Sequence, residues 1–113
     1  MKIAIPVADG RLCAHFGHCQ QFALIEVNPE TKEVAPAEYL TPPPHEPGVL
    51  PAWLAQQGAT IILAGGMGMR AQQMFVQNGI RVIVGVQNDD PPEKLVEHLV
   101  AESLQIGDNL CDH

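Results

Sequence analysis

Residues 60–86 read TIILAGGMGMRAQQMFVQNGIRVIVGV, and this stretch changes its periodicity twice. The aliphatic run 60–64 predicts a buried strand, and the glycine-rich turn that follows leads into apolar residues at helical spacing over 69–77. Asn78-Gly79 ends that helix, and 81–86 predicts a second strand. A strand–helix–strand unit crosses over right-handed, so its two strands lie parallel in one sheet.

The first forty residues are strand-rich in comparison. Strands are predicted at residues 2–8, 21–27 and 33–40, with a turn at 28–32 and a loop at 11–20 after Asp9-Gly10. The simplest arrangement places both parts in one α/β sheet. In this sheet the first and fourth predicted strands are adjacent, parallel and central. This arrangement predicts about five strands in the order 3-2-1-4-5, with helices packed on the faces.

Two further helices complete the predicted fold. One follows the proline-rich connector 41–48 and ends at Gly58. The other is capped by Asp90, with Pro91 at its first position and Glu93 completing a capping box. We expect a single domain over residues 1–113, in which residues 104–113 form a flexible tail.

The composition narrows the class of protein. The chain has 113 residues, of which 46% are hydrophobic and 17% charged, a globular composition. Its net charge is -7 with only six Lys and Arg, so a nucleic-acid partner or an anionic membrane surface is not expected. No apolar run approaches the roughly 20 residues of a membrane helix. We expect a cytoplasmic protein, in which an odd number of cysteines favours metal or redox chemistry over structural disulfides.

Potential soft-metal ligands gather in two short segments. All three cysteines and three of the five histidines lie there: Cys13, His15, His18 and Cys19 near the start, Cys111 and His113 at the end. Thiolate and imidazole suit zinc, copper and iron–sulfur species, although no CxxC pair supports a zinc ribbon or a dithiol oxidoreductase. Alternatively, Cys13 packs as a small hydrophobic residue, Cys19 begins a strand, and the last segment is either a disordered end or folds back to close a site.

The predicted topology brings other segments to the same place. Ligands of open α/β sheets bind outside the carboxyl ends of strands where the strand order reverses, here between the first and fourth strands. The loop 11–20, the turn 65–68 and His45 should meet at this edge. Backbone N–H groups of the turn, with Arg70 nearby, would hold an anion. The ordinary reading is that the glycines permit positive φ, Met67 packs in the core and His45 is solvated.

Three of these features, in this order, resemble a known family. They are His15-Phe16-Gly17 after the opening strand, His45 with Gly48 before a helix, and Gly65-Gly66-Met67-Gly68. The chain resembles the dinitrogenase iron-molybdenum cofactor biosynthesis family, which includes small nitrogenase cofactor carriers and the C-terminal domain of the cofactor-maturation radical enzyme. The resemblance implies a ribonuclease-H-like fold and non-covalent carriage of metal–sulfur clusters without catalysis. It also implies that the glycine turn is a wall of the pocket.

The leading hypothesis is therefore a carrier or scaffold for an iron–sulfur or mixed molybdenum, iron or copper sulfide cluster. It would act with a protein partner for cluster transfer, as a monomer or weak homodimer. The expected metal ligands are Cys13, His15, His18, Cys19, His45, Cys111 and His113. The expected cluster contacts are Phe16, Gly17, Gly65, Gly66, Met67, Gly68 and Arg70. The alternatives are a zinc-binding protein, a small thiol-based enzyme and a partner-binding module.

Overall fold

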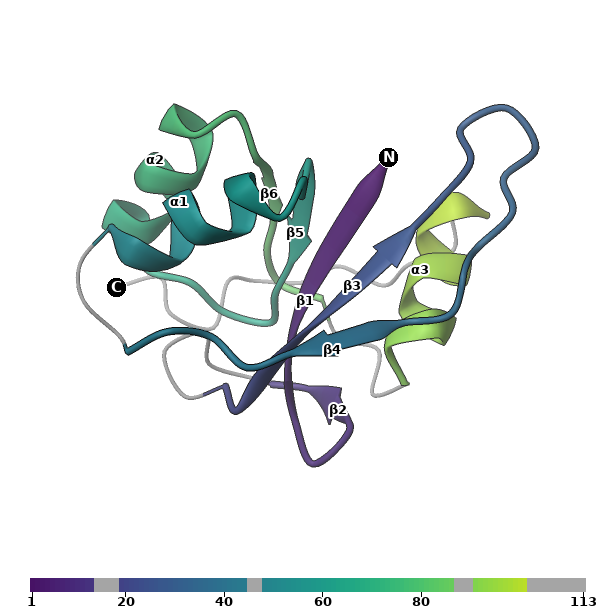
Figure 1. Cartoon of the computed structure of the whole chain (residues 1–113), viewed down its shortest axis with the longest axis horizontal. Helices are drawn as coiled ribbons and strands as arrows, with labels where there is room; N and C mark the ends of the chain where they lie inside the picture. Colours follow the sequence, from purple (N-terminus) through teal and green to yellow (C-terminus); the bar gives the residue numbers. More distant parts are fainter. Residues whose placement is uncertain (14–18, 45–47, 87–90, 102–113) are drawn as a thin grey trace.

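The computed structural model describes residues 1–13, 19–44, 48–86 and 91–101, and the described chain forms three layers (Figure 1). Its elements are β1 (Lys2–Ala8), β2 (Arg11–Leu12), β3 (Gln21–Glu26), β4 (Glu38–Leu40), α1 (Val49–Gln56), β5 (Ile61–Leu63), α2 (Met69–Gln77), β6 (Arg81–Ile83) and α3 (Pro92–Val100). Helices α1 and α2 cover one face of the sheet, and α3 covers the other.

The strand order confirms the predicted topology. The sheet runs β4-β3-β1-β5-β6, which is the expected order 3-2-1-4-5 of the five predicted strands. Strand β1 pairs antiparallel with β3 and parallel with β5, and β5 pairs parallel with β6. The crossover unit of residues 60–86 therefore extends the sheet beyond the central strand β1.

A sixth, short strand was not predicted. Asp9 and Gly10 take φ values of 56° and 78°, and these positive angles close a two-residue hairpin between β1 and β2. Val7 pairs with Leu12 and Ala8 with Arg11. The expectation of a plain loop over residues 11–20 was wrong at its start, although Asp-Gly is a recognised hairpin signal.

Two predicted strands are shorter than expected, for identifiable backbone reasons. The strand predicted at 33–40 is regular only over β4, because Pro36 lacks an N–H for the ladder and leaves Val34 in an isolated bridge with Val27. The strand predicted at 81–86 is regular only over β6 and ends at Ile83, since Gly85 takes a φ of 76°.

The predicted start of the last helix also needs correction. Helix α3 begins at Pro92, so Pro91 is the residue before the helix and not its first residue. Among the described residues, the buried Oε1 of Glu93 accepts no hydrogen bond, and the predicted capping box, which needs Asp90, stays a prediction. Asp90, the predicted cap, lies outside the described residues.

Both faces of the sheet are buried, which explains the nearly unbroken apolar strands. In β1, Ile3 and Ile5 point toward α3, while Ala4 points toward α1 and α2. Phe22 of β3 is fully buried on the α1 side, where its ring meets Trp53 edge-on at a centroid distance of 6.0 Å. This packing fixes the sheet as a rigid platform for the loops at its edge.

Gly79 ends α2 with a φ of 78°, a conformation in which a Cβ atom is strained. We expect Gly79→Ala to lower the free energy of unfolding by about 1 kcal/mol. Gly68, at the other end of α2, has a φ of -65° and no heavy atom within 4 Å of a built Cβ atom. Gly68→Ala is the control without left-handed strain, and it should cost about 0.5 kcal/mol, because alanine is a poorer N-cap than glycine. Urea denaturation of both variants checks this difference, and equal losses would contradict it.

Candidate functional site

The carboxyl ends of four strands meet at one edge of the sheet. Strand β4 is antiparallel to β3, which is antiparallel to β1, so β4 runs in the same direction as β1. Strands β5 and β6 share that direction. The predicted convergence of strand exits at the carboxyl edge is therefore confirmed.

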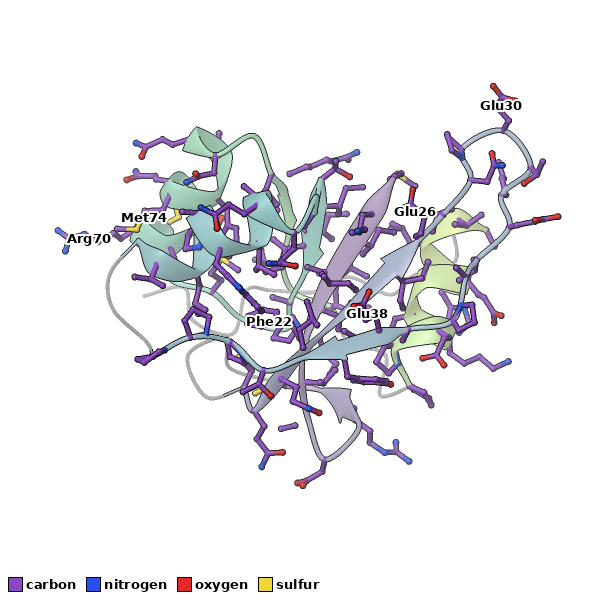
Figure 2. All side chains as sticks on the ribbon, in the orientation of Figure 1. Phe22, Glu26, Glu30, Glu38, Arg70 and Met74 are labelled. Atoms are coloured by element: carbon purple, nitrogen blue, oxygen red, sulfur yellow. The ribbon has the colours of Figure 1, made fainter. Side chains whose placement is uncertain are left out.

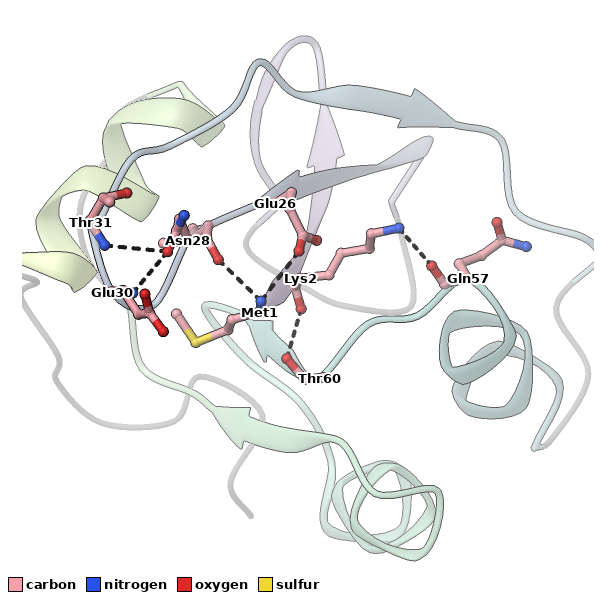
Figure 3. Close-up of polar contacts among 9 residues, drawn as sticks. Met1, Lys2, Glu26, Asn28, Glu30, Thr31, Gln57 and Thr60 are labelled. Carbon is pink, nitrogen blue, oxygen red and sulfur yellow. Dashed lines mark hydrogen bonds and ion pairs between the residues drawn. The ribbon is translucent and has the colours of Figure 1, made fainter.

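The opposite edge is tied together by the chain's own contacts (Figure 3). The terminal ammonium of Met1 lies 3.3 Å from Oε1 of Glu26 and donates to the carbonyl oxygen of Val27 at 3.1 Å. Lys2 donates from Nζ to the carbonyl oxygen of Gln57 at 3.0 Å, and the Thr60 hydroxyl donates to the carbonyl oxygen of Lys2. These contacts are structural, and the candidate site is the carboxyl edge.

Backbone hydrogen bonds hold both cysteines of the N-terminal cluster against the end of β1. The N–H of Cys13 donates to the carbonyl oxygen of Pro6 at 2.9 Å. The N–H of Gln20, next to Cys19, donates to the carbonyl oxygen of Val7, also at 2.9 Å. Pro6 and Val7 are consecutive residues of the central strand β1. They bind the two ends of the segment 13–20, and both cysteines therefore lie near the end of β1.

The two thiols are buried on the α1 and α2 side of the sheet. Cys13 and Cys19 are each only 8% exposed. They belong to the same core cluster as Phe22, Ala64 and Met67. The interpretation of Cys13 as a small core residue describes its packing correctly, whereas Cys19 precedes β3, which begins at Gln21. Both lie beside the carboxyl end of β1, the edge at which ligands of open α/β sheets bind.

Burial raises the pKa of the Cys19 thiol from 9.0 to about 11, and the neighbouring Cys13 contributes to the rise, while a backbone hydrogen bond partly opposes it. The thiol is therefore protonated at neutral pH. A nucleophilic cysteine needs a lowered pKa, so the thiol-based enzyme is the less favoured alternative for Cys19. A bound metal would instead displace the proton.

The raised pKa of Cys19 predicts slow alkylation. Near neutral pH its thiolate fraction should be about 100-fold below that of an ordinary thiol, because two pH units separate the two pKa values. The rate of iodoacetamide labelling, followed by peptide mass mapping, should keep rising with pH up to about 11. The same cysteine in the urea-unfolded chain is the control and should level off near pH 9. Fast labelling of the folded chain at pH 7 would contradict the assignment.

The glycine turn after β5 lies beside this cluster. Gly65, Gly66 and Met67 are buried, whereas Gly68 is exposed and begins α2 as its N-cap. Gly65, Gly66 and Gly68 do not take positive φ, so the expectation that they serve left-handed conformations was wrong. The neighbouring glycine that does take a positive φ is Gly85, at 76°. Its N–H donates to the carbonyl oxygen of Gly65 at 3.0 Å.

One supporting residue was missed by sequence reasoning. Gln72 donates from Nε2 to the carbonyl oxygen of Met67 at 2.9 Å. Its backbone N–H donates to the carbonyl oxygen of Gly68 at 3.1 Å. These bonds fix the turn relative to α2 and point the first N–H groups of that helix out of its N-terminus. The only sequence signal was a glutamine on the first turn of an otherwise unremarkable helix.

Arg70 lies at the outer end of α2. Its side chain is exposed and extends away from the body of the protein near Met74 (Figure 2). Its predicted contact with a bound cluster stays a prediction. Met67, in contrast, belongs to the same buried cluster as Cys13 and Cys19.

The remaining predicted site residues lie outside the described residues. They are His15, Phe16, Gly17, His18, His45, Cys111 and His113. Within residues 1–13, 19–44, 48–86 and 91–101, no three His, Cys, Asp or Glu side chains form a group that could hold a metal ion. The described part of the site is thus a pair of thiols beside a glycine turn. In the same part of the chain, no helix has the length and apolar character needed to cross a membrane.

A model of the dinitrogenase iron-molybdenum cofactor family matches residues 1–102. The chain belongs to this family. An uncharacterized protein of Methanocaldococcus jannaschii is 34% identical over 87 residues, which cover 73% of this chain and 72% of the relative.

Solved structures share the fold across nearly the whole chain. The crystal structure of PH0822 superposes with a TM-score of 0.82 at 29% identity, covering 95% of this chain and 96% of that one. The apo form of the orange protein from Desulfovibrio gigas gives a TM-score of 0.68 at 24% identity, covering 96% and 93%. These likenesses confirm the α/β fold class. The family assignment agrees with the resemblance drawn from His15-Phe16-Gly17, His45 and the glycine turn.

Proposed function

We propose that this member of the dinitrogenase iron-molybdenum cofactor family binds a metal–sulfur cluster and carries it to a protein partner without catalysing a reaction. The cargo would be an iron–sulfur cluster or a mixed molybdenum, iron or copper sulfide. The observation that carries the proposal is the pairing of Cys13 and Cys19, which two adjacent residues of β1 hold at the carboxyl edge. The family's name, which specifies a cofactor of this chemical class, supports it.

The donor set fits such a cargo. Thiolates are soft ligands that select iron–sulfur species, copper and zinc over hard cations such as magnesium. The two thiols lie among apolar side chains, which exclude water and strengthen electrostatic contacts to an anionic cluster. The N-terminal amides of α2 would stabilise the negative charge on cluster sulfides. The sequence adds His15, His18 and His45, with Cys111 and His113, as candidates to complete the ligand shell.

Competition between protons and the cargo for the Cys19 thiol would allow the site to release its cargo. Because the pKa of Cys19 is raised, the empty site holds a proton that cargo must displace. Binding through this thiol should strengthen as pH rises and weaken as pH falls. A reducing cytoplasm, where thiols stay unpaired, is the compartment that this mechanism requires.

The deciding experiment measures iron, molybdenum, copper, zinc and acid-labile sulfide in protein purified anaerobically without an affinity tag, together with its visible spectrum. The proposal expects a metal with stoichiometric sulfide and charge-transfer bands, either as purified or after reconstitution with metal salt and sulfide. Zinc without sulfide would support the zinc-binding alternative. A protein that stays metal-free and colourless after reconstitution would rule out the carrier function and favour a partner-binding module.

A further inference from the structure

Cys13 and Cys19 lie on opposite sides of the central strand. Val7 of β1 pairs with Leu12 of β2 and also with Gln21 of β3. A strand has only two edges, so β2 and β3 flank β1 on opposite edges. Cys13 follows β2 directly, and Cys19 lies two residues before β3. The two cysteines therefore approach the end of β1 from opposite edges.

The backbone hydrogen bonds at the end of β1 give the same result. The N–H of Cys13 donates to the carbonyl oxygen of Pro6, and the N–H of Gln20 donates to the carbonyl oxygen of Val7. Pro6 and Val7 are consecutive residues, and consecutive carbonyl groups of a β-strand point to opposite edges. The strand β1 therefore lies between the two ends of the segment 13–20 that carry the cysteines.

This arrangement sets the scale of the distance between the two thiols. Neighbouring strands lie about 4.8 Å apart, so two positions on either side of β1 are separated by about 10 Å. Both cysteines belong to the core cluster on the α1 and α2 side of the sheet. Their side chains therefore lie over the same face, with the width of one strand between them.

A single metal ion is too small to join two thiolates at this separation. A zinc–thiolate bond is about 2.3 Å long, so one ion holds two sulfur atoms at most about 4.6 Å apart. A disulfide is also too short, because it needs Cα atoms within about 7 Å of each other. A polynuclear metal–sulfide cluster, in which sulfide ions bridge several metals, is large enough to contact both thiols.

We propose that Cys13 and Cys19 bind opposite ends of one polynuclear metal–sulfide cluster that lies across the end of β1, and that they neither chelate a single metal ion nor form a disulfide with each other. The inference rests on the proposed function for the class of cargo and adds its minimum size. Each thiol binds a different metal, so the cargo contains at least two metals bridged by sulfide. A mononuclear zinc site formed by these two thiols is excluded.

Disulfide mapping tests the separation of the thiols without any cargo. The folded, metal-free chain is treated with an azodicarboxamide, which takes two electrons and two protons from a pair of thiols as their disulfide forms. Peptide masses then identify the bonded cysteines. The parent should form no disulfide between Cys13 and Cys19. Pro6→Cys is the control, because it places a thiol opposite Cys13 on the adjacent strand, where Cβ atoms of paired residues are about 4.5–5.5 Å apart.

The Pro6→Cys variant should form a disulfide between positions 6 and 13, which shows that the oxidant reaches this buried place. Circular dichroism checks that both proteins are folded. A disulfide between Cys13 and Cys19 in the folded parent would overturn the inference. A folded control variant without the bond between positions 6 and 13 would do the same, because the register that separates the two cysteines would then be wrong.

Metal binding tests the consequence for the cargo. Iron with sulfide, and zinc alone, are offered to the parent, to Cys13→Ser and to Cys19→Ser. Each serine variant should retain iron and sulfide at least about tenfold more weakly than the parent, because each loses a direct ligand. The affinity for zinc should not fall in both variants, since one zinc ion contacts at most one of the two thiols.

The outcomes separate this inference from the proposed function. A tenfold or larger loss of zinc affinity in both serine variants would show that one ion joins the two thiols, and the inference would be wrong. A parent that retains the cluster while either serine variant retains it equally well would overturn this inference alone. A parent that retains no cluster, although the disulfide mapping gives the expected result, would refute the proposed function and leave only the separation of the thiols.

Discussion

Replacing Cys13 and Cys19 together with serine is expected to lower the apparent affinity for a metal–sulfur cluster by more than about 100-fold, since even the loss of an outer-shell partner costs about 10–100-fold. Both thiols belong to one buried cluster beside the glycine turn. A serine hydroxyl is a harder ligand that stays protonated, so it replaces neither bond to a soft metal. Metal and acid-labile sulfide content after anaerobic reconstitution and gel filtration measures the loss.

The control for this experiment separates binding from stability. A buried hydroxyl costs about 1–3 kcal/mol, so the double variant is less stable than the parent. Val27→Ala removes methyl groups from the other core cluster and should cost a comparable amount without touching the thiols. It should retain cargo like the parent. If the serine variant still folds and binds the cluster normally, Cys13 and Cys19 are not its ligands.

Phe22→Ala is expected to lower the free energy of unfolding by about 3–5 kcal/mol, a large part of the 5–15 kcal/mol of a typical domain. Phe22 is fully buried in β3 and meets Trp53 of α1 edge-on. Its removal leaves a cavity between sheet and helix beside the two buried thiols. Urea unfolding followed by circular dichroism measures the change.

Tyr39→Ala is the matched control, an aromatic-to-alanine change in the neighbouring strand β4. Tyr39 is 43% exposed, so the same truncation should cost less than half as much. Burial and the charge of Glu93 raise the pKa of the Tyr39 phenol. This shift concerns the ionisation of the phenol and not the packing that the truncation removes. Similar losses in the two variants would show that the α1 side of the sheet is not the tightly packed face.

Periodicity in the sequence was sufficient to predict the sheet. The run 60–64, the glycine turn and the helix 69–77 together predicted a parallel crossover, and the observed helix has the predicted bounds. Once that unit was joined to the opening strand, few topologies remained. Boundaries failed where single backbone conformations decided them, as at Pro36 and Gly85. Those effects involve one residue and leave no periodic signal.

The site was predictable only in part, for a different reason. Topology predicted that the cysteine segment and the glycine turn meet at one edge, and the buried pair of Cys13 and Cys19 beside Met67 agrees with that. The sequence could not show that the thiols are desolvated, because burial depends on the packing of Phe22 and Ala64 around them. Nor could it show that Gln72 fixes the turn through a side-chain bond.

The two backbone bonds from Cys13 to Pro6 and from Gln20 to Val7 have an evolutionary consequence. They use only main-chain atoms, so the attachment of this segment does not depend on which side chains lie between its ends. A change of side chain between these two attachment points leaves both main-chain bonds to β1 available. The sequence of this segment can therefore change while the pairing of the sheet stays the same.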